Sequence, residues 1–285
     1  MIDRAIVHFS PRSRRLLSRR SARRLVGGET LESACDLSAR LNAEGKRVTL
    51  GVFGEDVASE KEARSIAAEG RRALEQIEAR GLDASLSVKL SALGLAVDEA
   101  LCFELLLALV AAADEKGSAV LIDMERSSAT EATLHLYRRL RERGHDNVGV
   151  ALQAHLRRTL DDIQGLADLS PRVSICKGSY ETATEALVPA GKLQELFLRA
   201  VSRSADCASL IGISTHDRDL IDESRRLLFL AGRTHTDYEF QTLLGVDPRL
   251  ETELIEAGEP LRVYVPYGED WYPYVSRRRA RIGKR

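Results

Sequence analysis

Residues 118–153 read SAVLIDMERSSATEATLHLYRRLRERGHDNVGVALQ and contain one complete repeat of the pattern that decides the fold. The runs 118–124 and 147–153 are short and rich in strand-forming residues, whereas 129–143 has a longer, helical pattern. Ser128 and Glu131 have the spacing of a capping box, which predicts the start of that helix. A strand, a helix and a second strand in this order are typical of a parallel β-sheet.

The same alternation extends through nearly the whole chain. Strand-like runs occur at eight places: 47–53, 84–90, 118–124, 147–153, 172–177, 209–215, 238–243 and 261–266. Helical patterns precede or separate them, for example at 31–42, 59–80, 97–116, 129–143 and 192–205. Ser59 and Glu62 repeat the capping-box spacing. No Gly-, Ser- or Pro-rich linker divides the chain, so we expect one domain.

Eight strand-then-helix units predict an α/β fold of the (β/α)8 TIM-barrel type, which commonly takes about 250 residues. A doubly wound open sheet is the competing architecture, and it would suit a dinucleotide. However, no GxGxxG motif follows the first predicted strand. We therefore predict a single barrel domain over residues 29–285.

Residues 1–28 have a different composition and are predicted to form a basic N-terminal helical arm. Eight arginines crowd the first 25 residues against one acid, Asp3. An Arg-rich start could also be an organellar presequence or a segment that touches anionic lipid. Leu16, Leu17 and Leu25 favour the helix, because they give it a face to bury. No apolar run reaches the roughly 20 residues of a membrane span.

The overall composition is that of a globular protein with ample core, at 44% hydrophobic and 30% charged residues. The net charge of -1 predicts no general attraction to nucleic acid. Cys35, Cys102, Cys176 and Cys207 form no CxxC pair, so neither a zinc site nor a disulfide framework is indicated. Reduced thiols in the cytoplasm are the expectation.

A polar or ionisable residue stands near the end of every predicted strand. In chain order these residues are Glu55, Lys89, Asp123, Gln153, Lys177, Thr215 with His216, Gln241 and Tyr264. In a (β/α)8 barrel the active site is built where the carboxyl ends of the strands meet. The sequence therefore predicts a large pocket lined by polar groups at that end of the barrel.

The last of these strands leads into residues 264–281, YVPYGEDWYPYVSRRRAR, where the aromatic residues of the chain concentrate. Stiff aromatic rings beside arginines could enclose a small apolar body and bind a carboxylate bidentately. An amphipathic C-terminal helix with a solvated basic face is the alternative for this stretch alone. The census of strand ends favours the first interpretation, since it makes the stretch part of a shared pocket.

The residue types of the pocket narrow its chemistry. A metal site is not expected, because His216 and Asp123 lack partners at ligand spacing. Lys177 could form a Schiff base with a carbonyl substrate. Its neighbours Gly178 and Ser179 favour instead a close approach of the backbone to something flat or phosphorylated. Cations that hold a carboxylate and cofactor phosphates, with aromatic walls, are compatible with hydride transfer.

Seven segments, in order, resemble the proline dehydrogenase family, particularly its one-function bacterial form. They are LSVKLSALG (86–94), LIDMERSS (121–128), VALQAHLRRT (150–159), VSICKGSY (173–180), STHD (214–217), YEFQTLLGV (238–246) and YVPYGEDWYPYVSRRR (264–279). The resemblance implies a distorted (β/α)8 barrel that binds FAD non-covalently. It also implies oxidation of L-proline to Δ1-pyrroline-5-carboxylate by hydride transfer to flavin N5. A quinone or other acceptor at the membrane surface would then take the electrons from a cytoplasmic enzyme.

The resemblance also implies roles for individual residues. The proline carboxylate would bind Lys89, Arg277 and Arg278. The ring would pack on Tyr264, Tyr274 and Leu243, with Tyr180 nearby. Asp123 would orient Arg278, and Glu55 would pair with Arg277 as a gate. The residues implied to contact FAD are Gln153, Lys177, Gly178, Thr215 and His216, together with position 174.

Position 174 is also where the chain departs from the family, which has an Arg at the reactive edge of the flavin where Ser174 stands. Further departures are Arg281 and Arg126 in place of acids, His155 in place of an aromatic residue, and Ser179 in place of Ala. These departures keep two alternatives open. One is the same flavoenzyme scaffold acting on another proline-like imino acid or a small amino acid. The other is a barrel that has lost flavin catalysis.

Overall fold

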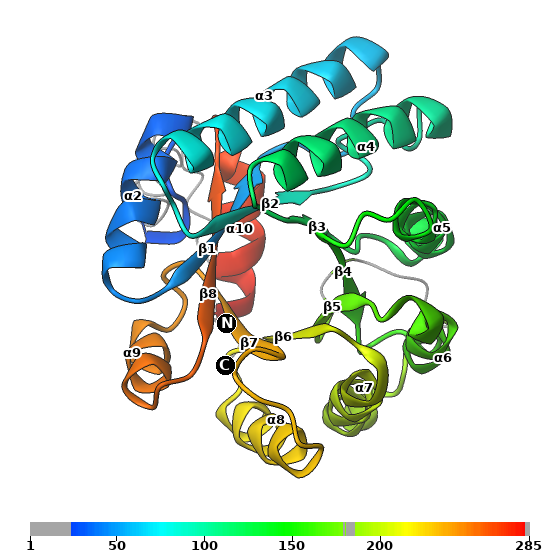
Figure 1. The fold of residues 1–285 in the computed structure, drawn as a ribbon, viewed down its shortest axis with the longest axis vertical. Helices are drawn as coiled ribbons and strands as arrows, with labels where there is room; N and C mark the ends of the chain where they lie inside the picture. The colour runs from blue at the N-terminus through cyan, green and yellow to red at the C-terminus, as the bar shows by residue number, and fades with distance from the viewer. Residues whose placement is uncertain (1–23, 179, 181–185, 283–285) are drawn as a thin grey trace, which may run out of the picture.

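A computed structural model describes residues 24–178, 180 and 186–282. Eight parallel strands pair in chain order and close into a barrel, because β1 pairs with both β2 and β8. Figure 1 shows the strands at the centre of the molecule and helices around them. The predicted (β/α)8 barrel is confirmed.

The strands fall where the apolar runs predicted them. They are β1 (Arg47–Val52), β2 (Ala84–Val88), β3 (Val120–Ile122), β4 (Val148–Gln153), β5 (Arg172–Cys176), β6 (Leu210–Ser214), β7 (Tyr238–Leu243) and β8 (Leu261–Tyr267). Every residue of β2 and of β4 is buried. Strands covered on both sides are expected to lack an exposed face, and these two strands have none. The third strand is shorter than predicted.

The helices that surround the strands are α2 to α9. Their bounds are α2 (Leu31–Ala43), α3 (Glu60–Ala79), α4 (Glu99–Glu115), α5 (Thr130–Arg141), α6 (Thr159–Gly165), α7 (Leu193–Cys207), α8 (Arg218–Leu230) and α9 (Pro248–Glu256). Helix α2 precedes β1 and packs against β1 and β8. It therefore fills the place in the outer ring that a helix after β8 would otherwise take.

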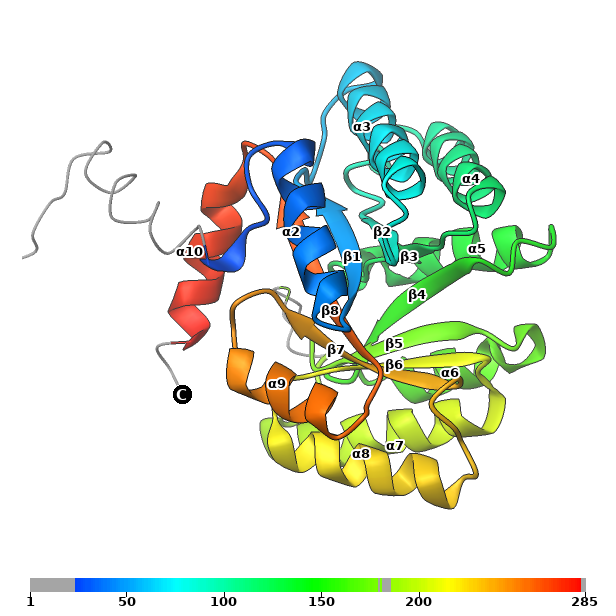
Figure 2. The same cartoon turned by 60° about the vertical axis from the view of Figure 1, so that its left-hand side comes forward.

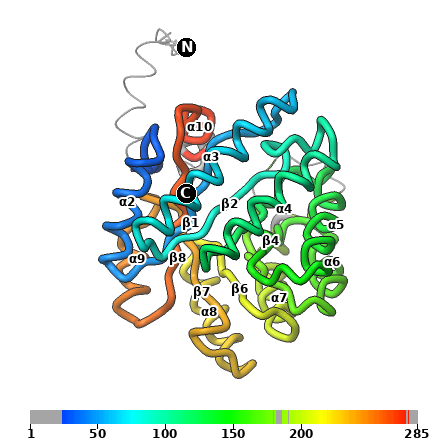
Figure 3. Tube along the Cα trace, turned by 45° about the horizontal axis from the view of Figure 1, so that its top comes forward, coloured from blue at the N-terminus to red at the C-terminus, as the bar shows by residue number. Residues whose placement is uncertain are grey.

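The helix after β8, α10 (Trp271–Ile282), lies at one end of the barrel instead of in the outer ring (Figure 2). Figure 3 places it beside the segment that precedes α2 and near the start of α3. Leu25 and Val26 form a small apolar cluster with Trp271 and Val275. The Trp271 Nε1 donates a hydrogen bond to Glu29 Oε1 at 3.0 Å. These contacts fix the start of α10.

The predicted arm, residues 1–28, lies mostly outside the described residues, and its boundary stays a prediction. Leu25 is buried, as predicted, whereas Leu16 and Leu17 are not described. No helix in the described part of the chain combines the length and apolar character needed to cross a bilayer.

One capping prediction is confirmed and one is wrong. Ser59 is the N-cap of α3, and its side chain accepts a hydrogen bond from the Glu62 N–H at 3.3 Å. Ser128 does not cap α5. It lies within a 3-10 turn, Ser127–Ala129, that runs directly into the helix. Because the backbone is already helical at Ala129, the extended N-cap geometry is absent there.

Candidate active site

Three of the predicted site residues meet at the carboxyl ends of β2, β3 and β8. Lys89 directly follows β2, Asp123 directly follows β3, and Tyr264 lies within β8. Ser87, two residues before Lys89 on β2, joins them. Residues two apart on a strand face the same side, so the barrel interior receives both side chains.

Asp123 is the centre of this group. It accepts a hydrogen bond from Ser87 Oγ at 2.7 Å and another from the Tyr264 hydroxyl at 3.4 Å. Burial raises the pKa of Asp123, and Lys89, Ser87 and Tyr264 oppose that rise only in part. The pKa of this carboxyl group therefore lies above its ordinary range. Burial likewise holds the pKa of Tyr264 well above its usual value.

Lys89 is the buried cation of the site, with a side chain that is 12% exposed. Its Nζ lies 3.7 Å from Glu55 Oε1, which also accepts a hydrogen bond from the Tyr180 hydroxyl at 3.4 Å. Burial lowers the pKa of Lys89, but the neighbouring Asp123, Tyr180 and Glu55 outweigh it and raise the pKa above its ordinary value. The ammonium group stays charged at neutral pH.

Aromatic rings form one wall of the site. Tyr274 of α10 packs on Phe53, with ring centroids 5.5 Å apart, and the Arg278 guanidinium lies 5.3 Å from the Tyr274 ring centroid. Burial raises the pKa of Tyr274, and Arg278 opposes the rise. Tyr264 occupies the space beside Gly51, where a Cβ would lie 2.4 Å from the tyrosine hydroxyl. The glycine is therefore needed for this packing.

Two predicted contacts of α10 stay predictions. Among the described residues, no ion pair joins Asp123 to Arg278, and Asp123 is bound by hydroxyl groups instead. Arg277 lies within α10, but its side chain is outside the described part of the structure, as are those of Arg279 and Arg281. The predicted pair of Glu55 with Arg277 is thus not tested, nor is the predicted contact at Ser179.

The predicted cofactor residues occupy the neighbouring strand ends, those of β4, β5 and β6. Lys177 Nζ lies 2.6 Å from Asp217 Oδ2, and Thr215 Oγ1 accepts a hydrogen bond from the Asp217 N–H at 3.2 Å. Although burial raises it, the bonded Lys177 lowers the pKa of Asp217 below its ordinary value. His216 Nε2 accepts a hydrogen bond from the Leu243 N–H at 3.1 Å.

Gly178 lies against the imidazole ring of His155, and its predicted approach to a bound ligand stays a prediction. Its φ is +100°, and a Cβ there would lie 2.3 Å from His155 Nδ1. A side chain at position 178 would therefore require both a left-handed backbone and displacement of His155.

Gln153 ends β4 and is 2% exposed. Its Nε2 donates hydrogen bonds to the carbonyl oxygens of Met124 and Glu125, at 3.1 and 2.6 Å. Its Oε1 is buried and accepts no hydrogen bond among the described residues. Buried acceptors are normally satisfied, so this oxygen is available to a donor group of a ligand.

Ser174 points into a polar layer inside the barrel. Its Oγ donates to Gln241 Oε1 at 2.6 Å, and Gln241 Nε2 donates to Glu239 Oε1 at 2.9 Å. Arg262 Nε completes the chain with a 2.6 Å contact to the same Glu239 oxygen. Sequence reasoning named Ser174 and Gln241 but missed Glu239 and Arg262, which the alternation along β7 and β8 could have suggested.

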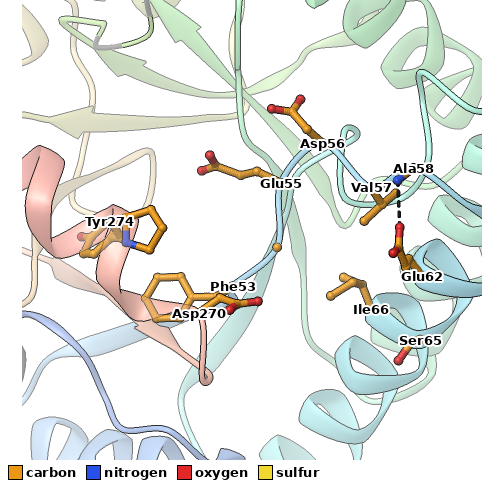
Figure 4. A pocket seen from close by; sticks show the side chains of 12 residues that line it. Phe53, Glu55, Asp56, Val57, Ala58, Glu62, Ser65, Ile66, Asp270 and Tyr274 are labelled. Atoms are coloured by element: carbon orange, nitrogen blue, oxygen red, sulfur yellow. Dashed lines mark hydrogen bonds between the residues drawn. The ribbon is translucent and has the colours of Figure 1, made fainter. Parts of the chain in front are cut away.

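A cavity of about 530 Å³ opens beside the site, between the loop that follows β1 and the starts of α3 and α10. Figure 4 shows Phe53 beside Tyr274 on one side, Val57, Glu62 and Ile66 on the other, and Glu55 and Asp56 on the loop between them. Glu55 and Tyr274 thus belong both to the site and to the cavity. Among the described residues, no group of three or more His, Cys, Asp or Glu could hold a metal ion.

Fold and site together define a parallel (β/α)8 barrel whose carboxyl end holds a buried ammonium, a guanidinium and tyrosine rings. A sequence profile described as Proline dehydrogenase matches residues 34–178. Proline dehydrogenase 1 of Bacillus subtilis (strain 168) is 36% identical over 262 residues, which cover 92% of this chain and 86% of that protein. Proline dehydrogenase of Deinococcus radiodurans is 34% identical over 262 residues, covering 90% and 84%. The chain therefore belongs to the proline dehydrogenase family and is an oxidoreductase of that family.

Solved structures support the same fold. Proline utilization A from Bdellovibrio bacteriovorus, inactivated by N-propargylglycine, superposes with a TM-score of 0.85 at 18% identity. Its counterpart from Corynebacterium freiburgense gives a TM-score of 0.80 at 19% identity. The matches cover 93% and 96% of this chain but only 33% and 32% of those chains. The chain thus spans about a third of their length.

The family implies a flavin cofactor, and the residues at the ends of β4 to β6 fit one. The unbonded Oε1 of Gln153 can accept a hydrogen bond from a ring N–H. Lys177, which is 32% exposed, can face an anionic group while it remains paired with Asp217. The residue types and the free acceptor are therefore compatible with a flavin nucleotide.

Proposed function

We propose that this protein binds FAD non-covalently and oxidises L-proline to Δ1-pyrroline-5-carboxylate. Family membership supports the substrate. The observation that carries the proposal is the buried Lys89 ammonium, which lies close enough to Tyr274 to affect its pKa, as does the Arg278 guanidinium, which also affects the pKa of Tyr264. A small imino acid has a carboxylate for the cations and an apolar ring for the aromatic wall.

Substrate binding would use the charges already present. Lys89 keeps its proton at neutral pH and would bind the carboxylate, with Arg278 and the predicted Arg277 as further partners. The pyrrolidine ring would pack on Tyr264, Tyr274 and Leu243. Glu55, next to Lys89, would give way to the carboxylate or receive the substrate ammonium group. Water exclusion by the tyrosine rings would strengthen these interactions.

In the reaction the ring carbon next to nitrogen loses a hydride, the nitrogen loses a proton, and a C=N bond forms between them. When bound, FAD would supply the hydride acceptor at its N5. The chain would contribute positioning: Asp123 and Tyr264 hold each other by their hydrogen bond, and Lys89 fixes the carboxylate end of the substrate. Gln153, Lys177, Gly178, Thr215 and His216 would hold the cofactor.

The pairing of Lys177 with Asp217 favours a cofactor role for this lysine over a Schiff base. A nucleophilic lysine must lose its proton, and a carboxylate 2.6 Å from Nζ stabilises the protonated form.

We propose that a quinone or another acceptor takes the electrons next, and that this enzyme of the cytoplasm meets it at the membrane surface.

Ser174 favours a second candidate, an oxidase or dehydrogenase of a related imino acid. The residue is buried and bonded to Gln241, so it offers no positive charge at a position where the family has Arg. A weaker electrostatic pull there would change flavin reactivity and with it the substrate range.

The visible spectrum and a substrate panel test the proposal. We expect purified protein to be yellow, or to become yellow with FAD, and to reduce a dye acceptor with L-proline. Faster turnover of a ring-expanded or ring-contracted imino acid would select the second candidate. Protein that stays colourless with excess FAD would contradict both.

Arg278→Met tests the carboxylate-binding role. Because the guanidinium lies against Tyr274 in the proposed carboxylate site, we expect the KM for proline to rise about tenfold or more, in line with a lost charge-assisted bond. The FAD Kd, from flavin fluorescence, should change less than twofold. Lys192→Met, at an exposed lysine paired with Glu195, is the control. Equal losses of proline and FAD binding would refute the role.

A further inference from the structure

In the loop that follows β1, residues 53–59, Asp56 has a backbone conformation that residues other than glycine disfavour. Asp56 has a φ of +51°, in the left-handed region. Such a conformation costs about 1 kcal/mol for a residue other than glycine, although Asp tolerates it better than most. It persists where the surroundings hold it in place, so the contacts of this loop decide its shape.

Those contacts come from the segment that follows β3. Arg126 donates two hydrogen bonds to Asp56, from Nη1 to Oδ1 and from Nη2 to Oδ2, both at 2.8 Å. Glu125 accepts bonds from the Ser91 N–H at 2.9 Å and from Ser91 Oγ at 2.6 Å. Ser91 in turn accepts from the Asp56 and Val57 N–H groups, each at 3.2 Å. The middle of the loop is thus held by one side-chain pair and by two bonds from its N–H groups to Ser91, while Phe53 N–H bonds Tyr267 and Ala58 N–H bonds Glu62 at its two ends.

The residue that this arrangement orients is Glu55. While Asp56 is turned to Arg126, the Glu55 carboxylate lies 3.7 Å from Lys89 Nζ and accepts a bond from Tyr180. Figure 4 shows Glu55 and Asp56 as neighbours on the loop, with their side chains pointing in different directions. A rotation of the loop about Asp56 would therefore move Glu55 relative to Lys89.

The ion pair of Arg126 with Asp56 is too exposed to contribute much to the stability of the fold. Arg126 is 55% and Asp56 51% exposed, and surface ion pairs contribute about 0–1 kcal/mol to stability. Its bidentate geometry is nevertheless directional. We propose that Arg126 and Asp56 are positioning residues that hold the β1 loop so that Glu55 stays beside Lys89 at the entrance of the substrate site. This inference rests on the proposed function, and it assigns the pair to substrate binding and not to the hydride step.

Arg126→Gln removes the pair and is the direct test. We expect the KM for proline to rise about three- to tenfold, the ratio that corresponds to about 1 kcal/mol, with kcat within twofold. Arg126→Lys should lie in between, because it offers one contact in place of two. Arg138→Gln, which breaks an equally bidentate exposed pair with Asp168, is the matched control and should leave KM unchanged.

Two further readouts separate positioning from general damage. Asp56→Asn keeps a residue that tolerates a positive φ. Because each substitution already breaks the same ion pair, the double variant with Arg126→Gln should have a KM for proline no higher than that of either single variant. High salt should raise the wild-type KM toward that of Arg126→Gln, because an exposed pair is screened. An additive double variant would overturn the proposal, as would a lower kcat at unchanged KM or equal effects of Arg126→Gln and Arg138→Gln.

Hydrogen exchange keeps the test independent of catalysis. Amides in a peptide covering residues 53–58 should exchange faster in Arg126→Gln than in wild type and in Arg138→Gln. If the wild-type protein oxidises no proline, the proposed function fails while this measurement still decides whether the pair holds the loop. Unchanged exchange in this peptide would overturn the inference.

Discussion

Asp123 is a buried carboxyl group whose ionisation depends on the hydroxyl groups around it. Its pKa lies above the ordinary value of 3.8 because burial disfavours the charged form, and the Ser87 hydrogen bond opposes that shift. Removing the hydrogen bond in Ser87→Ala should therefore raise the pKa further. A group needed in its ionised form loses function as the pH falls through its pKa.

We therefore expect the acidic limb of the kcat/KM profile for proline to move to higher pH in Ser87→Ala. The basic limb should stay, because Lys89 has a raised pKa that does not depend on Ser87. Ser85→Ala is the control: Ser85 lies on the same strand and is buried, but it bonds Thr49 Oγ1 at 2.9 Å. Superimposable profiles for wild type and Ser87→Ala would contradict the role given to Asp123.

At the scale of elements, the neighbouring strands β7 and β8 are joined by an ion pair between Glu239 and Arg262. Arg262 Nε lies 2.6 Å from Glu239 Oε1, and the side chains of Glu239 and Arg262 are 2% and 14% exposed. Removing one partner of a buried pair costs about 3–5 kcal/mol, whereas replacing both by apolar groups costs less. Arg262→Met should therefore lower the free energy of unfolding in urea by about 3 kcal/mol. The double variant with Glu239→Met should recover part of that loss. A single-variant effect below about 1 kcal/mol would contradict a structural role for the pair.

The pH dependence of this effect has a definite sign. Although burial raises it, Arg262 and its neighbours lower the pKa of Glu239 below the ordinary 4.5. Its stabilising contribution is thus complete above pH 4.5 and is lost as the pH falls through the depressed folded-state pKa. The stability difference between wild type and Arg262→Met should narrow below pH 4.5.

The elements were predictable where local pattern decides them. All eight strands coincide with short runs rich in strand-forming residues, which are too short to be helices. The failure at Ser128 arose because a 3-10 turn continues into α5, which capping-box spacing cannot reveal. The strand ends predicted that residues 264–281 belong to the pocket at the barrel end, but not that α2 fills the place in the outer ring between β8 and β1.

The candidate site was predictable in composition but not in its pairings. Strand ends identified Lys89, Asp123 and Tyr264, because parallel strands bring their carboxyl ends together. The pair of Arg126 with Asp56 joins residues 70 positions apart in two loops, where no periodicity operates. The hydrogen bonds of Asp123 to Ser87 and Tyr264 were likewise not predicted, because they depend on side-chain geometry inside the barrel, and the predicted contact of Asp123 with Arg278 stays a prediction.

For the whole molecule, the proposed cofactor residues lie at the ends of β4, β5 and β6. Most of the proposed substrate residues follow β1, β2 and β3 or belong to β8 and α10, whereas Leu243 ends β7 and Tyr180 follows β5. FAD would contact the ends of several strands that come together only in the folded barrel. Because a ligand that binds the folded state alone stabilises it, FAD binding should stabilise the barrel. At 100 times its Kd, FAD should add about 2.7 kcal/mol, or roughly 5 °C in Tm. A Tm that does not change with FAD concentration, in calorimetry, would argue against this site.

The most direct test of the central claim is anaerobic titration of the FAD-loaded protein with L-proline, followed by visible absorbance. We expect the flavin band to bleach on adding proline, and D-proline, which presents the opposite face to the same cations, to bleach it far more slowly. A flavin band that L-proline leaves unchanged in the loaded wild-type protein would contradict the proposed function.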